Sequence, residues 1–119
     1  MAAKDILGRA GEARAARHLE ERGYTILDRN WRCTQGELDI VAIDHGVLAI
    51  VEVKTRRSEA YGHPFEAVDA RKRRRLWGLA HAWLEAHPDL PRVRAVRLEA
   101  IGIVGDPESG ALEHLKDLS

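Results

Sequence analysis

A predicted β-hairpin carries the residues of this 119-residue chain that are best suited to chemistry. Two apolar segments flank a two-residue turn at 45–46, and such a turn fixes which residues of the two strands face each other. This pairing places Asp39 opposite Glu52, and it places Glu37 opposite Lys54. Because side chains alternate along a strand, Glu52 and Lys54 share one face. The hairpin is therefore expected to bring two carboxylates and one ammonium group together.

Two carboxylates that face each other in a buried hairpin indicate a metal site. The β-carbons of Asp39 and Glu52 would lie about 5 Å apart, and like charges in that position destabilise a sheet unless something compensates them. Mg²⁺ or Mn²⁺ would do so, because these ions prefer oxygen ligands and keep open positions for water. Lys54 could neutralise part of the charge or orient a water molecule. Glu12, on a predicted helix, could complete the site.

A purely structural interpretation stays open for the same residues. Glu37 and Lys54 could form a salt bridge, with Asp39 and Glu52 directed at solvent at a strand end. We favour the metal site because the register, the Glu-x-Lys spacing and the apolar flanks of both strands agree. Glu12 by itself could equally be a solvated residue on a charged helix.

The elements that must position these residues follow from periodicity and from helix-breaking residues. We expect a helix over 5–22, capped by Asp5 and ended by Gly23, and a long helix over 64–87 that Pro64 opens. The expected apolar stripes are Ile6, Leu7, Ala10, Ala13 and Ala16 in the first helix and Leu76, Leu79, Ala80, Trp83 and Leu84 in the second. Strands are expected over 24–31, 37–44, 47–55 and 93–104, with a final element of uncertain type over 111–118.

This order of elements predicts a single α/β domain over 1–119 with a central mixed sheet flanked by helices. The first three strands should be antiparallel, and the fourth should lie parallel to the third because a long helix connects them. Both faces of the second and third strands are apolar, so these strands should be central and covered on both sides.

Composition excludes several classes of function. Nineteen basic and nineteen acidic side chains balance, which argues against a general basic coat for nucleic acid. One cysteine excludes an internal disulfide framework and a multi-cysteine zinc site. No apolar run is long enough for a membrane helix, and the N-terminus has no signal-peptide core. We therefore expect a cytoplasmic protein without membrane contact.

Positive charge is nevertheless concentrated in two segments. The cations in question are Arg56 and Arg57 in a predicted loop, and the consecutive Arg71, Lys72, Arg73, Arg74 and Arg75 on the second helix. Five adjacent cations repel one another, so we favour a phosphate-bearing partner over the alternative of a solvated helix face. Tyr61 and His63 in the same loop could add stacking and further phosphate contacts.

The hairpin and its surroundings resemble a nuclease signature. Glu12, Asp39 and the Glu52-Val53-Lys54 sequence resemble the PD-(D/E)xK motif, with a leucine in the place of the proline. The wider block GELDIVAIDHGVLAIVEVKTR resembles the YraN family, uncharacterised protein family 0102, which is similar to archaeal Holliday junction resolvases. The resemblance extends from the segment GRAGEARAARHLEERGY to the strand over 95–103.

This resemblance implies a restriction-endonuclease-like three-layer fold and metal-dependent cleavage of DNA, including branched or junction DNA. The implied cofactor is Mg²⁺ or Mn²⁺, held by Asp39, Glu52, Glu12 and the backbone carbonyl of Val53. Lys54 would activate the attacking water or stabilise the phosphate. The alternative function is a non-catalytic nucleic-acid-binding module that keeps the nuclease fold.

The resemblance also implies a homodimer, because a four-way junction offers two equivalent phosphates to a two-fold enzyme. Apolar residues near the chain ends could form its interface, namely Trp31, Leu112, Leu115 and Leu118. The competing expectation is that residues 111–118 pack back on their own sheet.

Overall fold

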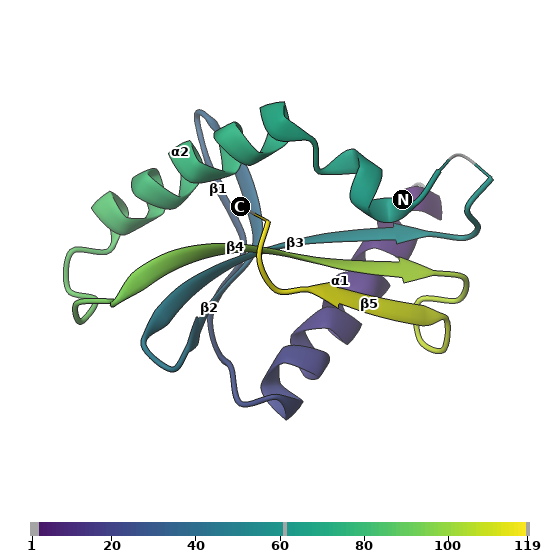
Figure 1. Cartoon of the computed structure of the whole chain (residues 1–119), viewed down its shortest axis with the longest axis horizontal. Helices are drawn as coiled ribbons and strands as arrows, with labels where there is room; N and C mark the ends of the chain where they lie inside the picture. Colours follow the sequence, from purple (N-terminus) through teal and green to yellow (C-terminus); the bar gives the residue numbers. More distant parts are fainter. Residues whose placement is uncertain (1–2, 61, 119) are drawn as a thin grey trace.

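A five-stranded mixed sheet lies between two helices, and this arrangement gives the molecule three layers (Figure 1). The computed structural model describes residues 3–60 and 62–118, with side chains from residue 6 onward. The elements are α1 (Ala3–Glu21), β1 (Thr25–Cys33), β2 (Gly36–Asp44), β3 (Val47–Arg56), the 3₁₀ helix η1 (Pro64–Ala67), α2 (Ala70–Ala86), β4 (Ala95–Val104) and β5 (Ala111–Leu115). The three-layer α/β arrangement expected of a restriction-endonuclease-like fold is confirmed.

The strands pair as the sequence predicts. β1, β2 and β3 form an antiparallel meander, β4 pairs in parallel with β3, and β5 returns antiparallel to β4. His45 and Gly46 make the turn between β2 and β3 with φ angles of 52° and 81°, and two successive positive φ angles are what a type I′ turn requires. The sheet order β1-β2-β3-β4-β5 places β2 and β3 in its interior, as expected.

The buried face of α1 differs from the predicted stripe. The helix begins at Ala3, so Asp5 lies within it rather than at its cap. Ile6 is 57% exposed, whereas Ala16 is buried as predicted. The other buried residues of the helix, Gly11, Ala15 and Leu19, lie outside the predicted stripe. These small side chains let α1 approach β3 so closely that a β-carbon on Gly11 would overlap the Thr55 hydroxyl. Small residues carry a weak hydrophobic signal, which is why periodicity identified only part of the buried face.

The helix predicted over 64–87 is two elements. Pro64 opens only the short η1, and α2 starts after Asp69. The carboxylate of Asp69 accepts a hydrogen bond from the backbone N–H of Lys72 at 2.9 Å and thereby caps a new helix. The apolar stripe predicted for α2 is confirmed by four buried residues, with Leu84 packed against the same core: Leu76, Leu79, Ala80 and Trp83. Of the helices in the described ranges, none combines the length and apolarity that crossing a membrane requires.

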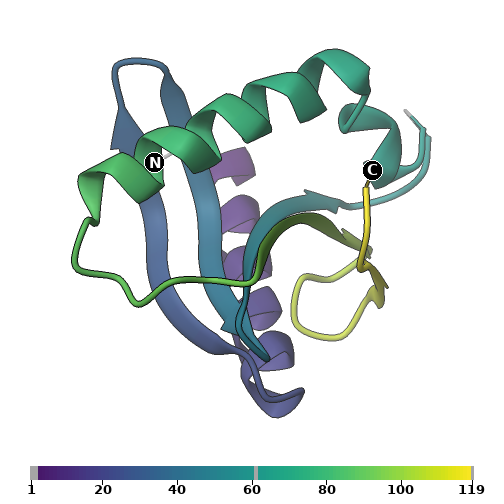
Figure 2. The ribbon, with the colours of Figure 1, turned by 60° about the vertical axis from the view of Figure 1, so that its left-hand side comes forward.

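One apolar core lies on each face of the sheet, and the helices cover them from opposite sides (Figure 2). The C-terminal segment also packs on this sheet, because Leu118 is 8% exposed and its N–H donates to the carbonyl of Leu98 at 3.0 Å. Trp31 and Leu112 pack partly against the cores, and of the four residues proposed as a dimer patch only Leu115 is exposed. The predicted apolar patch is therefore wrong, and the packing of residues 111–118 on their own sheet is confirmed.

A buried ionic network ties the end of α1 to β4 and β5. Glu99 is fully buried and accepts hydrogen bonds from the Tyr24 hydroxyl at 2.8 Å, Arg97 Nε at 2.7 Å and His114 Nε2 at 2.6 Å. Arg97 also donates to Asp44 at 2.7 Å. Burial raises the pKa of Asp44, but hydrogen bonding led by Arg97 outweighs it and lowers that pKa to about 2. The network therefore compensates its own buried charges within the fold.

Candidate active site

The regular pairing of β2 and β3 stops just before the predicted acidic pair. Backbone pairs run from the turn to Ile40 and Val51, one position short of Asp39 and Glu52. Beyond that point, Oδ2 of Asp39 accepts a hydrogen bond from the backbone N–H of Val53 at 2.9 Å. The side chain of Asp39 thus replaces a backbone partner at the place where the two strands part.

β1 is irregular at the same level of the sheet. The paired residues of β1 and β2 skip Asn30, which lies across from Asp39. Asn30 has a φ angle of 54°, in the left-handed region that asparagine adopts more readily than most residues. This conformation interrupts the alternation of β1, so that Arg29, Asn30 and Arg32 all line one cleft. The backbone around Asp39 is therefore irregular on both sides.

Asp39 and Glu52 share a poorly solvated environment. The Glu52 side chain is 16% exposed, and burial together with the charge of Asp39 raises its pKa to about 8. Burial also raises the pKa of Asp39, although the hydrogen bond from the Val53 N–H opposes this shift. Near neutral pH the pair therefore holds one proton between its two carboxyl groups. A further cation beside the pair would favour ionisation of both groups.

Lys72 already provides one positive charge at the pair. Its Nζ lies 3.6 Å from Oε1 of Glu52, and it reaches that carboxyl group from the first turn of α2. The sequence predicts Lys72 as part of a nucleic-acid-binding patch and gives no reason to connect it with Glu52. The contact depends on the angle at which α2 crosses the sheet, and no local pattern encodes that angle.

Glu12 approaches the acidic pair from α1. Burial and the charge of Asp39 raise the pKa of Glu12, while a hydrogen bond from Asn30 lowers it. Within residues 3–60 and 62–118, no three His, Cys, Asp or Glu side chains are grouped so that they could hold a metal ion. The structure therefore brings Asp39 and Glu52 together and keeps Glu12 nearby, without assembling the ligand set that the resemblance implies. The two carboxyl groups with raised pKa values are an oxygen donor set of the kind that Mg²⁺ or Mn²⁺ accepts, with water in the remaining positions.

The salt bridge required by the structural interpretation is absent among the described residues. Glu37 pairs with Arg32 on β1 at 3.1 Å, and none of the ion pairs joins Glu37 to Lys54. Lys54 is exposed at the end of β3, two residues beyond Glu52. Its ammonium group therefore faces solvent.

The predicted basic patch on α2 is divided in the structure. Lys72 is turned toward Glu52, and Arg73 donates to the carbonyl of Val68 at 3.1 Å. The three cations of this segment that are exposed to solvent are Arg71, Arg74 and Arg75. The five consecutive cations therefore do not form one continuous basic surface.

The loop after β3 contributes less than the sequence suggests. Arg57 is exposed, and Arg56, at the end of β3, is half-buried. His63 is engaged with Glu113, its Nε2 lying 2.9 Å from the carboxylate. Tyr61 lies outside the described residues. Of the residues predicted to contact nucleic acid in the described part of this loop, Arg57 is the one exposed cation.

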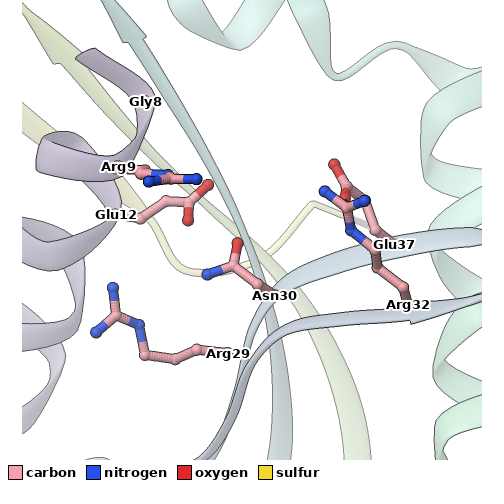
Figure 3. A pocket seen from close by; sticks show the side chains of 7 residues that line it. All are labelled: Gly8, Arg9, Glu12, Arg29, Asn30, Arg32 and Glu37. Carbon is pink, nitrogen blue, oxygen red and sulfur yellow. The ribbon is translucent and has the colours of Figure 1, made fainter. Parts of the chain in front are cut away.

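A cleft of about 690 Å³ opens between α1 and the β1–β2 hairpin (Figure 3). Arg9 and Glu12 project from α1, and the amide of Asn30 points toward Glu12. The lining residues are Gly8, Arg9, Glu12, Arg29, Asn30, Arg32 and Glu37. Sequence reasoning did not single out the arginines or Asn30 in this set. An asparagine inside a predicted strand was the one available signal, because asparagine tolerates the left-handed conformation.

Proteins from several bacteria are closely similar to the whole chain. A UPF0102 protein from Paenarthrobacter aurescens is 54% identical over 119 residues, covering 98% of this chain and 95% of the relative. A UPF0102 protein from Arthrobacter sp. is 50% identical over 117 residues, covering 98% of both chains. One from Acidothermus cellulolyticus is 48% identical over 117 residues, covering 91% of this chain and 88% of the relative. The family model described as "Uncharacterised protein family UPF0102" matches residues 11–103. The resemblance drawn from the hairpin motif is confirmed, and the chain belongs to uncharacterised protein family UPF0102.

Proposed function

We propose that this protein is a metal-dependent endonuclease that hydrolyses phosphodiester bonds in DNA. One observation carries the proposal: Asp39 and Glu52 meet at a poorly solvated position where β2 and β3 part, and a divalent cation would balance their charge. A buried carboxyl pair of this kind destabilises a fold, so its presence favours a functional role. The resemblance to the PD-(D/E)xK motif supports the same assignment.

In this proposal different residues bind the metal ion, orient its ligands and contact the phosphate. Bound Mg²⁺ or Mn²⁺ would relieve charge on the phosphoryl oxygens and polarise the attacking water. Asp39 and Glu52 would hold the ion, and the N–H of Val53 fixes the orientation of the Asp39 carboxylate. Lys54 is assigned the role of a cation toward the phosphate, because its side chain is exposed and a lysine base depends on desolvation. Glu12 would complete the ligand set or orient a water molecule.

The contact between Lys72 and Glu52 favours a second candidate function. A lysine ammonium 3.6 Å from Glu52 supplies positive charge to the acidic pair without any metal. A non-catalytic nucleic-acid-binding module with this fold would need only this lysine, and no metal ion, to balance the charge of the acidic pair. The two functions differ in metal binding, which isothermal titration calorimetry with Mn²⁺ measures directly.

A cleavage assay tests the enzymatic proposal. Linear, single-stranded, flap and four-way junction DNA are incubated with the protein and Mg²⁺ or Mn²⁺. We expect cleavage by the wild type, and its loss in Asp39→Asn and Glu52→Gln, which keep the size of the side chains. Glu85→Gln, which changes an exposed glutamate on α2, is the matched control and should cut normally. Absence of cleavage of every substrate, or equal cleavage by Asp39→Asn, would refute the proposal.

Branched DNA, a two-fold assembly and a cytoplasmic location belong to the same proposal. A junction presents two equivalent strands, so paired cuts would require two copies of the site. If the junction assay yields cleavage, sedimentation of the protein with uncleaved junction in Ca²⁺ should show two protomers on each junction. One protomer on each junction would remove the paired-cut mechanism while leaving the nuclease proposal intact.

A further inference from the structure

We infer that the cleft between α1 and the β1–β2 hairpin binds the phosphate backbone of one nucleic-acid strand, with Arg9 and Arg29 as its phosphate ligands. One part of this inference rests on the proposed function, namely that the bound strand runs toward Asp39 and Glu52. Binding itself does not depend on cleavage, so the two can be tested separately.

The chemistry of the lining favours a backbone over a small molecule or a base. Pockets for small ligands are lined mainly by apolar and aromatic side chains. This cleft of about 690 Å³ is lined by arginine, glutamate, asparagine and one glycine. With no aromatic ring to stack on a base, the described lining can recognise only charge and hydrogen-bonding groups.

Two of the three arginines in the cleft are available for an anion. Arg32 is already paired with Glu37 at 3.1 Å. Arg9 and Arg29 are exposed, and among the described side chains neither has a carboxylate within ion-pair distance. They come from different elements, α1 and β1, and the side chain of Arg29 extends from β1 toward α1 (Figure 3). Two guanidinium groups supplied by separate elements to one cleft suit the oxygens of a phosphodiester.

The cleft leads to the acidic pair. Glu12, the third carboxylate of the proposed ligand set, lies on its α1 wall (Figure 3). Asn30, which lies across from Asp39, forms part of the opposite wall. Arg29, Asn30 and Arg32 all line the cleft, and Asn30 among them has a left-handed φ angle of 54°. The irregular backbone at this point therefore shapes both the acidic pair and the arginine cleft.

Fluorescence anisotropy with a short labelled single-stranded DNA tests the inference, in EDTA so that cleavage plays no part. Arg9→Gln and Arg29→Gln should each raise Kd roughly tenfold, the loss of one charge-assisted contact. Each should also reduce the slope of log Kd against log salt concentration by about 0.7. Arg92→Gln is the matched control, because Arg92 is exposed in the α2–β4 connection and lines no part of this cleft. It should bind like the wild type.

Several outcomes would overturn the inference. Unchanged Kd values in Arg9→Gln and Arg29→Gln, or an equal loss in Arg92→Gln, would show that this cleft is not the contact surface. Binding of a mononucleotide as tightly as the labelled strand would show a small-molecule site. Wild-type binding that depends on the arginines, without cleavage in Mg²⁺ or Mn²⁺, would refute the nuclease and leave the cleft assignment standing. Cleavage by the wild type, combined with unchanged DNA binding by both variants, would support the nuclease and refute the cleft assignment.

Discussion

The raised pKa of Glu52 makes the stability of this protein depend on pH in an unusual direction. Its carboxyl group has a pKa of about 8 in the folded chain, against an ordinary value of 4.5. A carboxyl whose pKa is raised on folding adds stability below its unfolded pKa, and this stability is lost as pH rises through the folded pKa. Removal of that group should therefore help the fold at alkaline pH and make little difference in acid.

Glu52→Gln removes the ionisation and keeps the size of the side chain. With pKa values of 4.5 unfolded and about 8 folded, the wild type loses on the order of 4 kcal/mol between about pH 5 and about pH 9. The variant does not lose this contribution. The difference in unfolding free energy between the variant and the wild type should therefore grow by on the order of 4 kcal/mol over that range.

Urea unfolding followed by tryptophan fluorescence gives this difference, and buried Trp83 provides a signal from the core. The same experiment with Glu85→Gln controls for the loss of an exposed glutamate. At about pH 8, Mn²⁺ at a hundredfold excess over its Kd should stabilise the wild type by about 2.7 kcal/mol and the variant much less. A difference between Glu52→Gln and wild type that stays flat from pH 5 to pH 9 would refute the assignment of a shared proton to the acidic pair.

Three further predictions concern packing, the buried network and assembly. Gly11→Ala should lower the unfolding free energy by about 1–3 kcal/mol, because its methyl group overlaps the Thr55 hydroxyl. The additional change Thr55→Ala should recover most of the lost stability in thermal unfolding. No recovery in the double variant would contradict the clash. Tyr24→Phe should cost about 1–3 kcal/mol, because it removes one of three donors to buried Glu99; an unchanged Tm would contradict the role assigned to that hydrogen bond. Without DNA, sedimentation equilibrium at micromolar concentration should give a monomer near 13.3 kDa, because the chain packs most of the proposed dimer patch against itself; a dimer mass would contradict this.

Sequence reasoning succeeded where local rules determine the geometry. The two-residue turn at 45–46 fixed the hairpin register, and that register led to Asp39 and Glu52. The long helical connection fixed the parallel pairing of β3 and β4. The stripe of large apolar residues on α2 identified its buried face.

The features that sequence reasoning missed depend on contacts between distant segments. Lys72 meets Glu52 only because of how α2 lies on the sheet. Arg9 and Arg29 face one cleft only once α1 is docked and Asn30 has interrupted β1. The docking of α1 itself relies on small residues such as Gly11, whose contribution is close approach rather than hydrophobic area. The point where the β2–β3 pairing ends was missed for a similar reason. There the Asp39 carboxylate, rather than a backbone carbonyl, accepts the hydrogen bond from the Val53 N–H.

The single parallel pairing in the sheet has a consequence for the order of folding. Short turns join β1, β2 and β3, whereas the connection from β3 to β4 contains η1 and α2. Closing so long a connection costs chain entropy, and pairings between distant segments form late. The hairpin that carries Asp39 and Glu52 therefore forms before α2 delivers Lys72 to it. Repulsion between the two carboxylates acts on the folding barrier as well as on the finished fold, so this chain should fold faster in mild acid than at alkaline pH.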